Sequence, residues 1–126
     1  MTPKQAQRLI KKIADIKRGL AAEKRKFGGY DDSRGLRYLP TRYYIQLADY
    51  KVGLAYTHWF AKTFPDDIGF PDFLFEWALL LFKMGKFAEA KAKIWQTFCA
   101  NTYLFDKLLG FPVQLLTSMN GRVWRN

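Results

Sequence analysis

Apolar residues recur every three or four positions along most of this chain, and Gly or Pro interrupts the pattern at intervals. That spacing places apolar side chains on one side of a helix, whereas a half-buried strand needs strict alternation. The Gly and Pro residues end one helix and allow a turn before the next. The sequence therefore predicts an all-α fold of five to seven helices with no sheet. The expected helices cover residues 3–27, 40–48, 50–63, 73–84, 87–100 and 102–109.

The first expected helix is both amphipathic and strongly basic. Thr2 and Pro3 form a suitable start, and Gly28-Gly29 forms the stop. Residues 1–26 contain nine Lys and Arg against two acidic residues, within a chain whose formal net charge is +10. The opposite side carries an apolar stripe that we expect to dock on the rest of the protein, because it is too apolar to stay in water. This stripe consists of Leu9, Ile13, Ile16 and Leu20, and Phe27 continues it.

Two segments of the chain are similar to each other at a separation of 37 residues. In each, a short break is followed by an aromatic residue and, three positions later, by a small residue. Tyr50 and Gly53 in the first segment correspond to Phe87 and Ala90 in the second. A small residue allows a neighbouring helix to approach closely. The pattern resembles the tetratricopeptide family, whose repeat is about 34 residues long.

The resemblance implies a right-handed stack of antiparallel helix pairs over residues 37–65 and 71–100, of which the second matches best. Gly85 stands at the turn of that second pair. The first pair departs from the family, because Pro40 stands where a large apolar residue is expected and Thr57 is a weak core residue. The core positions that the resemblance gives to the second pair are Leu74, Trp77, Ala78, Leu81, Phe87, Ala90 and Ile94.

Two helix pairs alone bury too little surface, because each repeat needs a neighbour on both sides. We therefore expect residues 1–27 and 101–126 to act as N-terminal and C-terminal capping helices of a single domain over residues 1–126. Self-association of the chain is the alternative way to cover the open ends.

The resemblance also implies a concave binding face that is lined by the first helix of each pair. On the first helix of the second pair, Phe75, Leu79 and Phe82 form an apolar stripe distinct from the core stripe. This helix is therefore apolar on two sides. Its second side is expected to meet either the basic N-terminal helix or a partner. Of the family's set of Lys, Asn and Arg residues that holds an acidic chain terminus, only Lys83 is matched. The expected partner-binding residues are Tyr38, Arg42, Gln46, Phe75, Leu79, Phe82 and Lys83, with Asp72 beside them.

The residues that most catalytic sites require are scarce in this sequence. His58 and Cys99 are the only histidine and cysteine, which excludes the usual zinc sites, and the chain contains no Gly-rich phosphate loop. The acidic pairs at 31–32 and 66–67 flank turn residues, where Asp stabilises loops and helix starts. We therefore expect a protein without enzymatic activity, metal or cofactor. The loop over residues 30–34 is the most promising place for an unforeseen function, since loops often carry function.

A protein or peptide partner is the first expectation for function, and a second copy of this chain is included in that class. Binding of nucleic acid through the basic N-terminal helix is the alternative. The residues for that role are Lys4, Arg8, Lys11, Lys12, Arg18 and Arg25. The single cysteine is typical of a reducing compartment. Since no signal peptide or membrane-spanning stretch is found in the sequence, we expect a soluble cytoplasmic protein that does not bind membranes.

Overall fold

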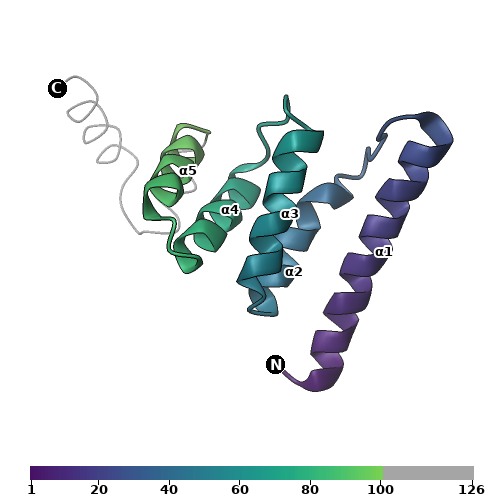
Figure 1. The fold of residues 1–126 in the computed structure, drawn as a ribbon, viewed down its shortest axis with the longest axis horizontal. Coiled ribbons are helices and arrows are strands. Elements are labelled where there is room, and N and C mark those ends of the chain that lie inside the picture. The colour runs from purple at the N-terminus through teal and green to yellow at the C-terminus, as the bar shows by residue number, and fades with distance from the viewer. Residues whose placement is uncertain (101–126) are drawn as a thin grey trace.

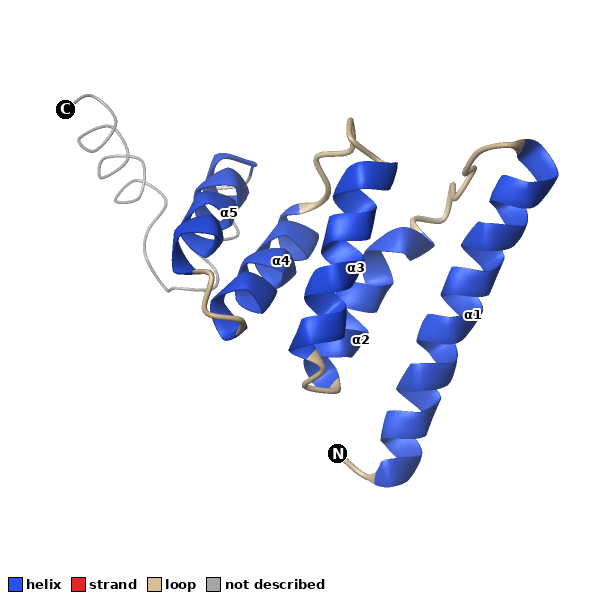
Figure 2. Cartoon of the chain, in the orientation of Figure 1, coloured by secondary structure: helices blue, strands red, loops and turns tan. Residues whose placement is uncertain are grey.

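A computed structural model describes residues 1–100, and over that range the chain is helical and contains no strand (Figures 1 and 2). This confirms the predicted all-α class. The predicted helix at 102–109 and the C-terminal cap at 101–126 lie outside the described residues. The elements in chain order are α1 (Pro3–Phe27), the 3-10 helix η1 (Leu36–Tyr38), α2 (Leu39–Gln46), α3 (Tyr50–Thr63), α4 (Pro71–Lys83) and α5 (Phe87–Ala100).

Both ends of α1 form as the sequence predicts. Thr2 Oγ1 accepts the Gln5 N–H at 3.2 Å, and Gln5 Oε1 accepts the Thr2 N–H at 3.0 Å. This reciprocal cap satisfies two backbone donors that have no partner within the helix. At the other end, Gly28 adopts a left-handed φ of 76° and its N–H donates to the Lys24 carbonyl. Local residues thus fix the length of α1.

The helices of the body form two pairs, α2 with α3 and α4 with α5, each joined by a turn of three residues. α4 packs against α2, α3 and α5, whereas α1 packs against η1 and α2. In Figure 1, α1 lies at one end of the described chain, and α2 and α3 stand between it and α4. The outer side of α4 is therefore not covered by α1, which answers the question that the sequence left open.

The predicted docking of α1 is confirmed for its central residues. Ile13 and Leu20 are buried, and Ile13 packs with Tyr44 and Tyr56. Leu9 and Ile16 are half-buried. Phe27, however, is exposed, so its expected place on the docking side is wrong. Near the end of α1 the inward position is taken instead by Glu23, whose carboxylate accepts backbone N–H groups of the following loop.

The body has a core of large apolar residues from α3 and α4. The largest of its fully buried apolar side chains are Phe60, Phe73, Leu74, Leu80 and Leu81. Three threonines are also buried, and two of them donate the hydroxyl to a carbonyl of their own helix: Thr57 to Leu54 at 2.6 Å and Thr97 to Lys93 at 2.7 Å. A threonine that is paired in this way buries no unsatisfied polar group. Thr57 is therefore a true core residue.

The predicted core positions of the second pair are correct for Leu74, Ala78, Leu81 and Ala90, which are buried. Trp77 is half-buried and packs against this core, so its assignment is correct in part, whereas Phe87 and Ile94 are exposed and those two assignments are wrong. α4 is apolar on nearly every side, and spacing alone does not tell which apolar side turns inward. Trp77 instead lies at the core rim, where Lys93 Nζ stands 3.7 Å from its ring centroid. Partial burial lowers the pKa of Lys93.

Gly53 allows α2, α3 and α4 to meet. A Cβ at this position would lie 2.9 Å from Leu80 Cδ2 on α4 and 2.9 Å from Tyr44 Cβ on α2. Carbon atoms pack at about 3.5–4.0 Å, so no side chain fits without movement of a neighbouring helix. The small residue of the sequence pattern thus corresponds to a close helix approach.

We expect Gly53→Val to destabilise the protein by about 1–3 kcal/mol, the usual cost of forcing extra carbon atoms into a packed core. Gly19→Ala is the matched control, because Gly19 lies inside α1 with nothing within 4 Å of an added Cβ. That change should stabilise by up to about 1 kcal/mol, since Ala favours a helix over Gly. Thermal unfolding followed by circular dichroism measures both. Equal stability of Gly53→Val and the parent would contradict the close approach.

Candidate partner-binding surfaces

The outer side of α4 presents apolar side chains to solvent. Phe75 is 37% and Phe82 is 55% exposed, while Leu79 between them is half-buried. The Phe82 ring meets the Phe87 ring at 5.4 Å, so Phe87 extends the patch onto α5. Lys83 lies at the edge, with Nζ 5.5 Å from the Tyr50 ring. We call Phe75, Leu79, Phe82 and Lys83 the α4 outer face.

The three predicted binding residues from the first pair have different environments. Tyr38 is half-buried, its ring packs against Phe60, Phe70 and Phe73, and its hydroxyl donates to Asp67. Arg42 is half exposed, and its Nε donates to Glu76 on α4 at 2.9 Å. Gln46 is exposed in the last turn of α2. Arg42 and Gln46 are thus accessible, whereas Tyr38 is held in place by contacts within the protein.

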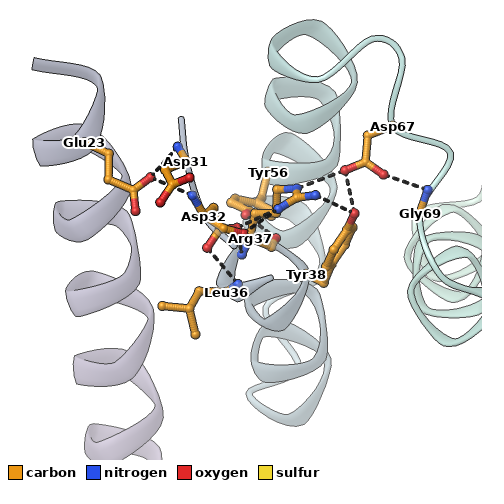
Figure 3. A network of polar contacts seen from close by, with 9 residues as sticks. All are labelled: Glu23, Asp31, Asp32, Leu36, Arg37, Tyr38, Tyr56, Asp67 and Gly69. Atoms are coloured by element: carbon orange, nitrogen blue, oxygen red, sulfur yellow. Dashed lines mark hydrogen bonds and ion pairs between the residues drawn. The ribbon is translucent and has the colours of Figure 1, made fainter. Parts of the chain in front are cut away.

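A polar network that sequence reasoning missed centres on Arg37 (Figure 3). Its guanidinium donates to the Asp32 carboxylate at 2.9 Å, to the Asp67 carboxylate at 2.9 Å and to the Tyr38 hydroxyl at 2.8 Å. Its planar group also lies 4.4 Å from the Tyr38 ring centroid and 5.3 Å from that of Phe64. This one side chain therefore joins the loop after α1 to the turn before α4.

Backbone groups complete this network. The Asp32 carboxylate accepts the N–H groups of Leu36 and Arg37, and Glu23 of α1 accepts those of Asp31 and Asp32. We call the whole set the Arg37 network; it consists of Glu23, Asp31, Asp32, Leu36, Arg37, Tyr38, Tyr56, Asp67 and Gly69. Asp32 and Asp67 bind backbone and guanidinium donors, which agrees with the structural role predicted for the two acidic pairs.

The network shifts the pKa values of its members Tyr38, Tyr56 and Asp67. Burial raises the pKa of Tyr38 to about 12, and the hydrogen bond to the Asp67 carboxylate acts in the same direction. Burial alone would raise the pKa of Asp67, but hydrogen bonds from Tyr38 and Arg37 outweigh it and hold that pKa below its ordinary value. Burial likewise raises the pKa of Tyr56, whose hydroxyl donates to the Arg37 carbonyl at 2.5 Å. Near neutral pH the tyrosines are neutral donors and Asp67 is an anionic acceptor.

The basic side of α1 faces solvent. Arg18 pairs with Asp15, and Lys12 lies over the Tyr43 ring at 5.7 Å. The other four predicted cations have neither a hydrogen bond nor an ion pair to any residue within 1–100. They stand at steps of four, three and fourteen residues, which places them on one side of the helix. We call these four the α1 outer face; it consists of Lys4, Arg8, Lys11 and Arg25.

The part of the chain that the structure describes holds neither a cluster of metal-ligating side chains nor a membrane-spanning helix. Within residues 1–100, no three His, Cys, Asp or Glu side chains lie close enough together to hold a metal ion. In the same range, no helix combines the length and apolarity needed to cross a membrane.

Comparison of the chain with protein-family models, curated proteins and solved structures finds no match, so the tetratricopeptide resemblance stays a prediction.

Proposed function

We propose that this chain is a non-catalytic interaction module, built from two tetratricopeptide-like helix pairs, that binds a protein or peptide through the α4 outer face. The observation that carries the proposal is the two-sided character of α4. One side holds fully buried core residues such as Leu74 and Leu80, yet Phe75 and Phe82 on the other side stay in water. Large aromatic side chains are enriched in binding hot spots, and exposed apolar patches often mark interfaces.

The surroundings of the face give it a polar rim. Arg42 and Glu76 pair across α2 and α4, and Lys83 stands at the far end. An apolar centre with a polar rim is the usual anatomy of a protein interface. We therefore expect a partner segment that inserts apolar side chains between Phe75 and Phe82.

Selection from a phage-displayed library of random peptides tests this proposal. We expect enriched peptides with apolar residues, whose affinity falls by at least about tenfold, or 1.4 kcal/mol, in Phe75→Ser/Phe82→Ser. Phe27→Ser is the matched control, because Phe27 is an exposed phenylalanine on a different helix. If the enriched peptides bind the double variant as well as the parent, the α4 outer face is not the binding surface. A dimer in sedimentation that the double variant abolishes would identify a second copy as the partner.

A second candidate function is binding of polyanions, and it rests on the unpaired cations of the α1 outer face. Cations that contact phosphates release counterions, so affinity falls with salt by a log–log slope of about −0.9 per phosphate. Changing Lys4, Arg8, Lys11 and Arg25 to Gln should flatten that slope for duplex DNA of random sequence. Changing Lys51, Lys62, Lys86 and Lys91 to Gln removes the same charge elsewhere. If the salt dependence of DNA affinity flattens equally in both variants, only the net charge of the protein matters.

A further inference from the structure

A groove of about 430 Å³ runs between α1 and α3, apart from the α4 outer face. Its wall on α1 includes Leu20 and Ala21, and its wall on α3 includes Val52, Ala55 and Trp59. α1 packs mainly on η1 and α2, and the groove lies where α1 and α3 are less closely packed. Val52 is 42% and Trp59 is 37% exposed, so this apolar stripe of α3 is only partly covered by the chain itself.

Aromatic contacts fix the shape of the groove. Trp59 packs edge-to-face on Tyr30 at 6.2 Å and lies 5.3 Å from the Tyr56 ring. Tyr56 is itself held by its hydrogen bond to the Arg37 carbonyl, and Tyr30 packs on Phe64 at 5.1 Å. Binding sites are usually preformed in this way, which lowers the entropy cost of binding. The groove is thus a built feature of the fold.

The charge of the groove is positive. None of the residues that line it is acidic, and Lys17 is its charged member. Lys17 Nζ lies 5.4 Å from the Tyr44 ring and 5.9 Å from the Tyr56 ring, and Lys24 Nζ lies 5.5 Å from the Tyr30 ring. Neither ammonium group has an ion pair with any residue from 1 to 100. These two cations are therefore available to carboxylates of a ligand.

The length of the groove suits a helix. Its lining runs from Val52 to Trp59 on α3, which is seven residue steps, or two helical turns and about 10 Å, and Lys24 follows Lys17 by the same seven steps on α1. A trough bounded by two helices accepts the apolar side of a third, whose anchors stand at i, i+3, i+4 and i+7.

We propose that the groove between α1 and α3 binds an acidic amphipathic helix of a partner protein. Apolar side chains of that helix enter between Leu20, Ala55 and Trp59. Its Glu or Asp residues meet the ammonium groups of Lys17 and Lys24. This is a second interaction surface on a different pair of helices, so its test does not depend on whether the α4 outer face binds a partner.

Two labelled synthetic peptides test the proposal on the full chain. Both carry Leu at i, i+3, i+4 and i+7, one with Glu and the other with Lys at the flanking positions. Fluorescence anisotropy measures their affinities, and amide chemical shifts in ¹H–¹⁵N spectra locate the site. We expect the Glu peptide to bind at least about tenfold more tightly than the Lys peptide. The largest shifts should fall at Val52, Ala55 and Trp59.

Variants on α3 and α1 sharpen the test. Ala55→Trp fills the groove and should weaken the Glu peptide by about tenfold or more, whereas Ala61→Trp, on an exposed position of the same helix, should not. Lys17→Gln/Lys24→Gln should reduce the preference for Glu over Lys, and Lys86→Gln should not. Melting curves confirm that each variant is folded.

Three results would overturn the proposal: equal binding of the two peptides, shifts confined to other helices, or unchanged affinity in Ala55→Trp. Laurate and vesicles of anionic phospholipid are tested in parallel. If either shifts the groove amides while the Glu peptide does not, the occupant is an anionic amphiphile and the acidic-helix proposal is wrong.

Discussion

Deletion of residues 1–26 is expected to abolish cooperative unfolding of the remaining chain or to cause its aggregation. The deletion removes the buried side chains of Ile13 and Leu20, and it uncovers Tyr44 and Tyr56, which are buried against Ile13. It also removes the Glu23 carboxylate that accepts two loop N–H groups. Loss of a single buried large apolar side chain costs about 2–5 kcal/mol, and here two are lost, in a domain whose total stability is about 5–15 kcal/mol. Calorimetry and sedimentation of the truncated chain measure the outcome.

The control for this deletion keeps α1 and removes only its charge. In this control, four cations of α1 are changed to Gln: Lys4, Arg8, Lys11 and Arg25. The variant should have a melting temperature close to that of the parent, because these side chains have no hydrogen bond or ion pair within residues 1–100. A truncated chain that stays monomeric and melts cooperatively would show that α1 is a detachable arm. That result would also favour polyanion binding over the α4 outer face as the main function.

Arg37→Met is expected to destabilise the protein by about 3 kcal/mol. Removing one member of a buried ion pair costs about 3–5 kcal/mol, and Arg37 is 21% exposed, which favours the lower end. The change leaves the buried Asp32 carboxylate and Asp67 without the guanidinium, while Met keeps the apolar stem. Arg34→Met is the control, because Arg34 is exposed and makes no ion pair within the described residues. Urea unfolding at pH 7 compares the two variants.

The effect of Arg37→Met should depend on pH. The pKa of Asp67 is lowered in the folded parent, so its ionised form contributes stability above the ordinary pKa. That contribution is lost as the pH falls below about 4 and through the folded pKa. The parent should therefore lose more stability than Arg37→Met in acid, and the difference between their free energies of unfolding should become smaller. A gap that is constant from pH 7 to pH 3 would mean that Arg37 acts through packing alone.

The helix ends could be predicted because their signals are local. Gly28, Pro65 and Gly85 each act within a few residues of the helix that they end, and the structure has α1, α3 and α4 stop beside them. The docking of α1 through Ile13 and Leu20 followed from spacing alone. These features need no knowledge of which segments meet in space.

The Arg37 network could not be predicted in the same way. Arg37 and Asp67 are thirty residues apart, and the chain offers 21 Lys and Arg as candidates for any one acid. The only local signal was the pair of Asp residues beside each turn. The partial exposure of Trp77 was missed for a different reason: α4 offers Phe73 and Leu80 as equally apolar neighbours, and only the positions of α2 and α3 decide which are fully buried.

The Arg37 network draws its members from α1, the loop after it, η1, α3 and the turn before α4. Opening any one of these segments breaks hydrogen bonds to another, because the Arg37 guanidinium, the carboxylates of Glu23, Asp32 and Asp67 and the Tyr56 hydroxyl link them in series. Local opening in proteins proceeds by cooperative units of this kind. We therefore expect the amide protons of Asp32, Leu36 and Gly69, although far apart in sequence, to exchange as one cooperative unit, so that the loop after α1 does not open on its own.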